Sequence, residues 1–550
     1  MIIDARTIEN EKVFDCDICI VGAGAAGITI ARELSSSKLN IILLESGGMH
    51  KERKTQDLYR GEVANTNLHG ALHLYRQRSF GGTTNVWGGR CAPLDNIDFE
   101  TRNYITYSGW PIERHILDEY YKRAHHYCEI GTYDYECASA LPNASLYVDG
   151  LNSPDLLTNS LWRFSPPTNF RKAFLPEFKN NSNMRIFLHA NCLKIISNDN
   201  GTQVQKVYVT SLHKNTFFVK AKKFVLAMGG LEVARILLLS HDIRSSGIGN
   251  ENDLVGRFYG SHISGTCGKF VFRQGVRVQW DFDRTTDGVY CRRKFTLSER
   301  KQRELQVINM SGIIDHPPAA IPSHRNGVLS SMYLLKNILT SRIPPEYSKS
   351  LSTITKYHDV VSHLRNIVFD VPRLIAFTTK WIDQRIVRYR KLPAVTLSSK
   401  ANEYAFHFDA EQSPNYESKV SLSRTGRDFF DLPVIKVDWR VNSSDIEMIR
   451  TNFQFIDMEL KRFGVGRLVY DDVTISNLMS TTVSVGSHHL GTTRMASNAK
   501  EGVVDKNSSV FSTPNLFIAG PSVFASSGYA NPVLTTVALS IKLSDHLRND

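Results

Sequence analysis

The chain of 550 residues is 42% hydrophobic, 22% charged and 10% aromatic, which is typical of a globular protein with a large core and excludes disordered, collagen-like and coiled-coil chains. At about 150 residues per domain, this length corresponds to three or four domains. The 66 Lys and Arg against 54 Asp and Glu give a net charge of +12, a mild bias over so much surface that does not indicate nucleic-acid binding.

The start of the chain and its cysteines bear on location. Residues 1–14 mix charged side chains with apolar ones, so we expect no cleavable signal peptide. The sequence contains no run of about 18 uncharged apolar residues, so we expect no transmembrane segment. Eight Cys in 550 residues do not suggest a disulfide framework, so we expect a reducing compartment and a cytoplasmic location.

The first strong signal lies in residues 17–48, where Gly22, Gly24 and Gly27 form the pattern G-x-G-x-x-G between a predicted strand and a predicted helix. Gly22 permits a tight turn, Gly24 lets the backbone approach a pyrophosphate, and Gly27 lets the helix pack closely on the strand. The start of the helix offers N–H groups to phosphates. The predicted elements are strands over 18–21 and 39–44 and a helix over 25–34.

Glu45 ends the second of these strands. An acidic side chain at this distance from the glycines can accept hydrogen bonds from both hydroxyls of an adenosine ribose. No Arg follows it to hold a 2′-phosphate, so we do not expect NADP. The segment therefore predicts a dinucleotide site but leaves FAD and NAD as alternatives.

Three later segments repeat the association of glycines with strands or helices. A loop with four glycines, SFGGTTNVWGGRC, occupies 79–91, where the backbone can approach a ligand closely. A strand over 224–227 leads through two glycines into a helix ending near 240. A strand over 516–519 and a turn precede a helix from 532 to 547, with Pro532 where a missing N–H costs nothing. These segments indicate one dinucleotide domain interrupted by another domain.

We therefore predict an α/β fold: a Rossmann-like domain with a three-layer parallel sheet, interrupted by a substrate domain with a mostly antiparallel sheet and helices. Runs over 418–423 and 432–439 read as antiparallel strands. Residues 330–395 read as a basic, aromatic, helical insertion: a lid or oligomer contact, or alternatively a membrane-surface or partner-binding element. The dinucleotide domain is placed at 1–110, 185–264 and 481–550, and the substrate domain at 111–184 and 265–480.

Near the C-terminus, VGSHHLGTTRM at 485–495 carries two adjacent histidines beside a glycine and two threonines. Histidine suits alcohol oxidation because its ordinary pKa near 6.5 lets it take a hydroxyl proton at neutral pH. A structural or surface role is the alternative. We do not expect a metal site, because no further His, Cys, Asp or Glu lies at the spacing of a zinc ligand set.

In combination, these motifs resemble the glucose–methanol–choline (GMC) oxidoreductases, FAD-dependent enzymes that oxidise alcohols. The resemblance covers most of the chain. Its motifs are GAGAAG…ESGG, GGTTNVWGG, AMGGLEVARILLLS, LVGRFYGSH, EQSPNYESKVSLS and SHHLGTTRM followed by GPSVF and YANPVLTT.

The resemblance implies a mechanism. The family's catalytic histidine corresponds to His488 rather than His489, and its partner corresponds to Asn531. An Asn at this position resembles the sugar-oxidising branch that includes pyranose oxidases and fructose dehydrogenases. His488 would remove the hydroxyl proton while hydride passes from carbon to flavin N5. Asn531 would hydrogen-bond the alcohol oxygen.

The resemblance also implies which residues hold FAD. Some members of the family attach FAD through a His in the glycine loop, but Val86 stands at that place here, so we expect FAD to be bound without a covalent link. Gly22, Gly24, Gly27 and Glu45 would hold pyrophosphate and ribose; Gly82, Thr83, Trp87 and Gly88 would line the isoalloxazine and pyrophosphate; Cys192 and Ala227 would lie near adenine; and Gly520, Pro532 and Val533 would return to the flavin.

The function predicted from the sequence is thus FAD-dependent oxidation of a CH–OH group, on a sugar or polyol-like substrate. The electron acceptor is open between oxygen, a quinone and a redox protein. Two alternatives are a flavoprotein without redox turnover and a lyase of this family that acts on a cyanohydrin with a structural flavin. A plain NAD dehydrogenase is disfavoured, because three separate contributions to one cofactor suit the larger FAD.

Overall fold

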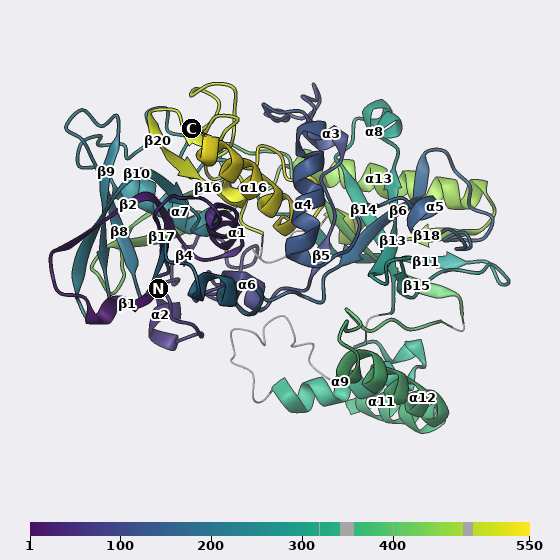
Figure 1. Ribbon diagram of the computed structural model, residues 1–550. Helices are drawn as coiled ribbons and strands as arrows, with labels where there is room; N and C mark the ends of the chain where they lie inside the picture. The colour runs from purple at the N-terminus through teal and green to yellow at the C-terminus, as the bar shows by residue number, and fades with distance from the viewer. Residues whose placement is uncertain (318, 341–356, 400, 477–487, 550) are drawn as a thin grey trace.

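The computed structural model describes residues 1–317, 319–340, 357–399, 401–476 and 488–549. These residues form sheets of nine, eight and three strands, and the two larger sheets lie in opposite halves of the molecule (Figure 1). The first contains a parallel core and the second is antiparallel, which confirms the predicted α/β fold with two different sheets.

The nine-stranded sheet is built around buried apolar strands. All four residues of β3 (Ile41–Leu44) and the last four of β2 (Lys12–Val21) are buried, as strands covered on both faces require. Strands β8 (Asn191–Ser197) and β9 (Val204–Thr210) extend the sheet in antiparallel fashion beside the first half of β10. The parallel order is β1 (Ile2–Asp4), β7 (Met184–Leu188), β3, β2, β10 (Thr216–Leu226) and β20 (Thr513–Ile518), with β19 (Ser509–Val510) antiparallel at the edge.

Helices from both ends of the chain pack together beside this sheet. Helix α1 (Ala25–Leu34) has the predicted bounds, and it packs against α16 (Val533–Asn549), which begins directly after Pro532. Helix α4 (Asp118–Cys128) packs against α16, and α6 (Phe170–Lys179) packs against α1. The N- and C-terminal segments therefore share one core.

The eight-stranded sheet is antiparallel throughout and packs against α13 (Ser443–Arg462). The Phe453 ring of α13 lies 4.9 Å from that of Phe406 and 5.4 Å from that of Phe408. The strand order is β18 (Gly466–Val469), β11 (Ile263–Phe272), β15 (Glu403–Ala410), β14 (Met310–Asp315), β13 (Tyr290–Leu297), β6 (Leu156–Phe164) and β5 (Arg90–Cys91), with β12 (Asp283–Arg284) beside β13.

The third sheet is small. Strands β16 (Lys419–Arg427) and β17 (Pro433–Asp438) pair in antiparallel fashion, which confirms the two strands predicted over 418–423 and 432–439. However, they pair with β4 (Glu62–Val63) rather than with the eight-stranded sheet, and they pack against α7 (Gly229–Leu239). The domain boundaries given above stay a prediction.

The helical insertion predicted over 330–395 is confirmed where the structure describes it. It consists of α9 (Gly327–Thr340), α11 (Tyr357–Phe369), α12 (Val371–Trp381) and the π-helical turn η5 (Ile382–Val387); residues 341–356 lie outside the described part. Figure 1 shows α9, α11 and α12 as a separate lobe beside the body. No helix among the described residues is long and apolar enough to cross a bilayer.

The remaining elements are short. They are the 3-10 helices η1 (Ala5–Thr7), η2 (Gly82–Asn85), η3 (Arg114–Leu117), η4 (Pro322–His324) and η6 (Pro521–Val523), and the helices α2 (Arg53–Asp57), α3 (Asn96–Phe99), α5 (Cys137–Ala140), α8 (Glu299–Leu305) and α14 (Asp472–Ser476).

Candidate active site

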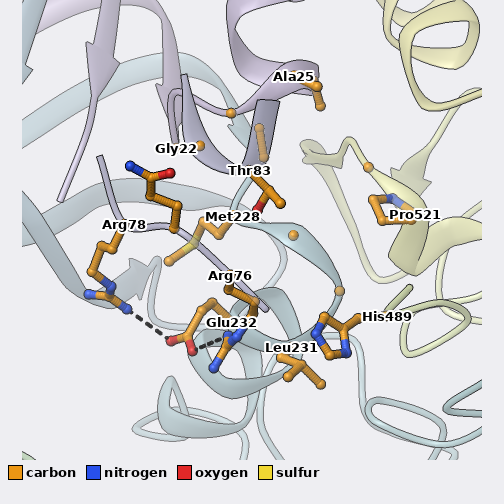
Figure 2. Close-up of a pocket in the computed structure, with 18 of the residues that line it drawn as sticks. Gly22, Ala25, Arg76, Arg78, Thr83, Met228, Leu231, Glu232, His489 and Pro521 are labelled. Atoms are coloured by element: carbon orange, nitrogen blue, oxygen red, sulfur yellow. Dashed lines mark hydrogen bonds and ion pairs between the residues drawn. The ribbon is translucent and has the colours of Figure 1, made fainter. Parts of the chain in front are cut away.

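A cavity of about 720 Å³ lies at the carboxyl ends of the central parallel strands. Its wall includes Val21 at the end of β2, Leu44 at the end of β3, Ala227 after β10 and Ala519 after β20. Open parallel sheets bind nucleotides at this edge. Figure 2 shows part of the wall, including Gly22, Thr83 and Pro521 from three distant segments.

The glycines of the G-x-G-x-x-G turn have two roles: some line the cavity, and another permits close packing of α1 on β2. Gly22 has φ of +104°, which favours glycine, and a Cβ on Gly24 would meet no protein atom within 4 Å. A Cβ on Gly27 would lie 1.9 Å from the carbonyl oxygen of Gly22. Gly22 and Gly24 line the cavity whereas Gly27 does not; Gly27 instead lets α1 approach β2.

Glu45 is buried at the wall of the cavity. Its carboxylate accepts N–H groups from Ala23 at 3.0 Å and Gly47 at 2.8 Å. Burial raises the pKa of this carboxyl, while the two N–H groups act in the opposite direction. The position suits an acceptor for sugar hydroxyls beside a glycine turn that leaves room for phosphates, so these residues fit a dinucleotide.

The structure brings the predicted site residues together in this one cavity, with Gly27 as the exception. His488 and Asn531 line it as well. The predicted cofactor residues that line it are Gly22, Gly24, Glu45, Gly82, Thr83, Trp87, Gly88, Cys192, Ala227, Gly520, Pro532 and Val533.

A charged cluster in the cavity wall was not predicted from the sequence. The Glu232 carboxylate accepts hydrogen bonds from Arg76 at 2.9 Å and Arg78 at 3.3 Å (Figure 2). Burial opposes ionisation of Glu232, but these guanidinium groups lower its pKa. Both guanidinium groups lie over the ring of Tyr59. The cavity wall thus carries two fixed cations around a buried carboxylate, and no periodic pattern in the sequence marks them.

At another part of the wall, His488 and Asn531 lie side by side. The Asn531 amide nitrogen Nδ2 is 3.4 Å from Nε2 of His488. Arg90 donates from Nε to Oδ1 of Asn531 at 2.8 Å, and because a guanidinium can only donate, this contact fixes which way the amide points. Arg90 is held in turn by Asp409 at 2.8 Å and by the ring of Trp162.

His262 forms a hydrogen bond with His488, and it was not assigned a role from the sequence. The two Nδ1 atoms lie 2.7 Å apart, and Nε2 of His262 is 3.3 Å from the backbone oxygen of Ser527. His262 is part of the motif LVGRFYGSH, so the signal was present, but only the fold shows that it meets His488.

These contacts determine where the imidazole protons lie. The Ser527 carbonyl can only accept, so neutral His262 carries its proton on Nε2 and its lone pair on Nδ1. His488 must then donate from Nδ1, which leaves the lone pair on Nε2, facing the Asn531 amide. Burial holds the pKa of His488 well below 6.5, and the neighbouring His262 and Arg90 lower it further, so the ring is neutral at neutral pH.

His489 belongs to a second chain of hydrogen bonds. Its Nδ1 is 2.8 Å from the Tyr259 hydroxyl, which is 2.8 Å from Nε2 of His69, and Nδ1 of His69 is 2.7 Å from the oxygen of Gly70. By the same logic, Tyr259 donates to His69 and His489 donates to Tyr259. Nε2 of His489 is buried and has no hydrogen-bond partner among the described residues. In Figure 2 this ring lies near Leu231 and Arg76, with the charged cluster.

A glycine turn at the carboxyl edge of a parallel sheet, with an imidazole base in the same cavity, defines a dinucleotide-binding oxidoreductase architecture. Comparison with known proteins shows which family the chain resembles. Models of the GMC oxidoreductase family match residues 168–264 and 414–540. Over these two segments the chain is similar to the GMC oxidoreductases.

Curated relatives match parts of the chain. The 2-methyl-1,2-propanediol dehydrogenase of Mycolicibacterium austroafricanum is 28% identical over 137 residues, 25% of this chain and 24% of that protein. The C-glycoside 3-oxidase of Arthrobacter globiformis is 27% identical over 127 residues, 23% of each protein. The fructose dehydrogenase large subunit of Gluconobacter japonicus is 22% identical over 342 residues, 61% of this chain and 49% of that one. Each match therefore spans less than half of the relative's own length.

Solved structures share the whole fold. A pyridoxine 4-oxidase from Mesorbium loti superposes with a TM-score of 0.52 at 16% identity, covering 97% of this chain and 99% of that one. A fungal aryl-alcohol oxidase superposes with a TM-score of 0.55 at 12% identity, with the same coverage. At these identities the likeness concerns the fold alone. The matching family models indicate that the dinucleotide is FAD.

Proposed function

We propose that this chain is an FAD-dependent oxidoreductase that oxidises a CH–OH group of a sugar or polyol-like substrate to a carbonyl. The observation that carries the proposal is the lone pair on Nε2 of His488, held 3.4 Å from the Asn531 amide in a wall of the dinucleotide cavity. The relatives that are named for acting on a diol, a glycoside and fructose support an alcohol substrate.

Each side chain has a distinct task in this proposal. His488 accepts the hydroxyl proton at Nε2, and His262 keeps that atom free of a proton beforehand. The Asn531 amide donates to the alcohol oxygen and holds it beside His488, while Arg90 keeps the amide in that orientation. Bound FAD would supply the acceptor for the hydrogen and electron pair that leave the carbon.

The cofactor would be held by the glycine turn, Glu45 and the loop of residues 82–88. Val86 occupies the place from which some members of the family attach FAD, and a valine side chain offers no nucleophile for such a bond. The proposal therefore includes non-covalent FAD. Acid precipitation of the holoprotein should release all of the flavin into the supernatant, and yellow colour that stays with the denatured chain would contradict this part.

The substitution His488→Ala tests the catalytic role. The variant should fold and keep its flavin, but the rate constant for flavin reduction by the active alcohol should fall by about 10²–10⁴. The measurement is anaerobic stopped-flow absorbance, with a panel of sugars and polyols used first to find that alcohol. Bleaching of the flavin by an alcohol would also exclude the lyase and the flavoprotein without turnover.

Two control variants sharpen this test. His489→Ala removes the adjacent imidazole, and at saturating FAD we expect its reduction rate constant to fall by less than about tenfold, because that ring lies with the charged cluster. His126→Ala removes an exposed imidazole on α4 and should change nothing. If His488→Ala reduced the flavin as fast as His126→Ala, the proposed base would be wrong.

A further inference from the structure

The helical lobe presents large apolar side chains to solvent. Phe369 is 79% exposed and Tyr389 is 80% exposed, although both are large aromatic residues. Isolated apolar side chains on a surface are ordinary, but a group of them on neighbouring helices indicates a contact site. We call the exposed apolar residues of α11, α12 and η5 the apolar face; they are Val361, Leu364, Val368, Phe369, Val371, Ile375, Ile382, Ile386 and Val387.

The positions follow the helical period. On α11 the exposed residues 361, 364 and 368 are three and four positions apart, and on α12 residues 371 and 375 are four apart. Residues 382 and 386 in η5 repeat this spacing of four. Side chains at these intervals project from the same side of a helix, so α11 and α12 are each amphipathic with an outward apolar stripe.

The opposite side of the lobe is specifically packed, so the exposure does not reflect a loose segment. The Asp370 carboxylate accepts the N–H of Gly327 at 2.9 Å, and the Ser330 hydroxyl is 2.9 Å from Nδ1 of His363. A separate small core joins α9 and α12 to the irregular segment before β15; it contains Val328, Leu329 and Leu397, with Leu374 and Phe377 against them.

The net positive charge of the lobe favours an anionic binding partner. Between residues 357 and 391 the sequence has seven Lys and Arg but three Asp and Glu. Asp383 pairs with Arg388 at 2.7 Å, and Lys380 pairs with Asp281 of the body at 3.1 Å. With these pairs set aside, the segment still has more cations than acids. A second copy of the chain would bring the same positive face against this one, whereas anionic headgroups would complement it.

We propose that the apolar face docks on a lipid bilayer that contains anionic phospholipid. Its apolar side chains would enter the boundary between headgroups and acyl chains, and the cations at its rim would meet the headgroups, as in other interfacial amphipathic helices. Rim cations include the exposed residues Arg365 and Lys391.

The lobe also contacts the strands that carry the candidate active site. Three residues after η5, Arg390 donates to the backbone oxygens of Glu129 at 2.9 Å and Phe164 at 3.3 Å. Phe164 is paired with Arg90 in the β5–β6 ladder, and Arg90 orients the Asn531 amide in the cavity. A docked molecule would thus be attached to the membrane through an element joined to the cavity wall.

Vesicle co-sedimentation of the full-length holoprotein tests this proposal without reference to activity. The probes are phosphatidylcholine vesicles and vesicles of phosphatidylcholine with phosphatidylglycerol. We expect sedimentation with the second kind, weakened by salt because the screening length shortens. Val368→Glu/Ile375→Glu should weaken vesicle affinity by more than about tenfold, since burying one such side chain is worth at least that factor.

A matched control variant places the same charges elsewhere. Val473 is 64% exposed and Ile243 is 49% exposed, and both lie outside the lobe, so Val473→Glu/Ile243→Glu should bind vesicles as the wild type does. Flavin content and thermal unfolding should match in both variants. The proposal is overturned if the wild type fails to sediment with anionic vesicles, if both variants bind alike, or if size-exclusion chromatography shows a dimer that Val368→Glu/Ile375→Glu dissociates while vesicle binding is absent.

Discussion

His262 shows how one side chain can decide the protonation of another. Its Nδ1 accepts a hydrogen bond from the Nδ1–H of His488 across 2.7 Å, because its own proton is on Nε2 and points to the Ser527 carbonyl. A free imidazole in water divides its proton between the two nitrogens, whereas this arrangement selects the form with a lone pair at Nε2. His262 is therefore a positioning residue in the proposed mechanism rather than one that touches substrate.

We predict that His262→Leu lowers the rate constant of flavin reduction about tenfold or more while flavin stays bound. Burial is the main cause that holds the pKa of His488 well below 6.5, so the wild type should stay active below that pH, because the neutral form of His488 is the active one.

His262→Asn is the conservative counterpart, because its side-chain oxygen can accept the Nδ1 proton of His488 much as the imidazole does. Its pH–rate profile should lie close to that of the wild type. If both variants lost activity equally, His262 would have a packing role only. The readout is the pH dependence of single-turnover reduction.

At the scale of elements, the turn between β2 and α1 contains one glycine that matters for stability and another that matters for ligand binding. Gly27→Ala would place a Cβ 1.9 Å from the backbone oxygen of Gly22, so α1 would have to move away from the sheet. We expect the free energy of unfolding to fall by about 1–3 kcal/mol or more. Urea unfolding of the flavin-free protein measures this loss without a contribution from bound ligand.

Gly24→Ala provides the contrast within the same turn. Gly24 has φ of −85°, which alanine adopts readily, and no protein atom lies within 4 Å of the added Cβ. The variant should unfold like the wild type, yet bind FAD more weakly, because its methyl group enters the cavity. Flavin titration of the stripped protein would show this, and unchanged affinity would place the cofactor elsewhere.

Elements with a local signature could be predicted from the sequence. The apolar runs of β2 and β3 and the helix Ala25–Leu34 follow from periodicity and the glycines between them. The two-residue strand β5 could not, because Arg90 and Cys91 join the second sheet only through pairing with β6. The sequences of β16 and β17 predict strands, but they do not show which sheet these strands join.

The candidate site likewise contains residues that could be predicted from the sequence and residues that could not. His488 and Asn531 were predicted through their motifs, and the structure brings them together. Arg76, Arg78 and His262 were not, because each is a single polar residue whose partner lies more than 150 positions away for the arginines and more than 200 for the histidine. Contacts over such separations depend on packing, which leaves no pattern along the chain.

At the scale of the whole molecule, a buried ion pair joins the two large parts of the fold. Arg102 donates to both carboxylate oxygens of Glu411, at 2.8 and 2.5 Å, and both side chains are almost fully buried. Glu411 directly follows β15 of the eight-stranded sheet, whereas the loop of Arg102 packs near Phe524 through Trp110.

We predict that Arg102→Met destabilises the fold by about 3–5 kcal/mol, because it leaves a buried carboxylate without its partner. The double variant Arg102→Met/Glu411→Leu should recover a large part of this loss. Calorimetry of the holoprotein and the variants provides the measurement. If the single and double variants unfolded at the same temperature, the pair would not couple the two parts.

The strand order has a consequence for synthesis of the protein. Strand β10 is synthesised long before β20, which pairs with its far side. Until β20 has been made, that edge of β10 is open to wrong partners, and the pocket lacks its last wall. We therefore expect a nascent chain that still lacks β20 to need protection by chaperones, and a truncation before β20 to yield an aggregation-prone product rather than a smaller working protein.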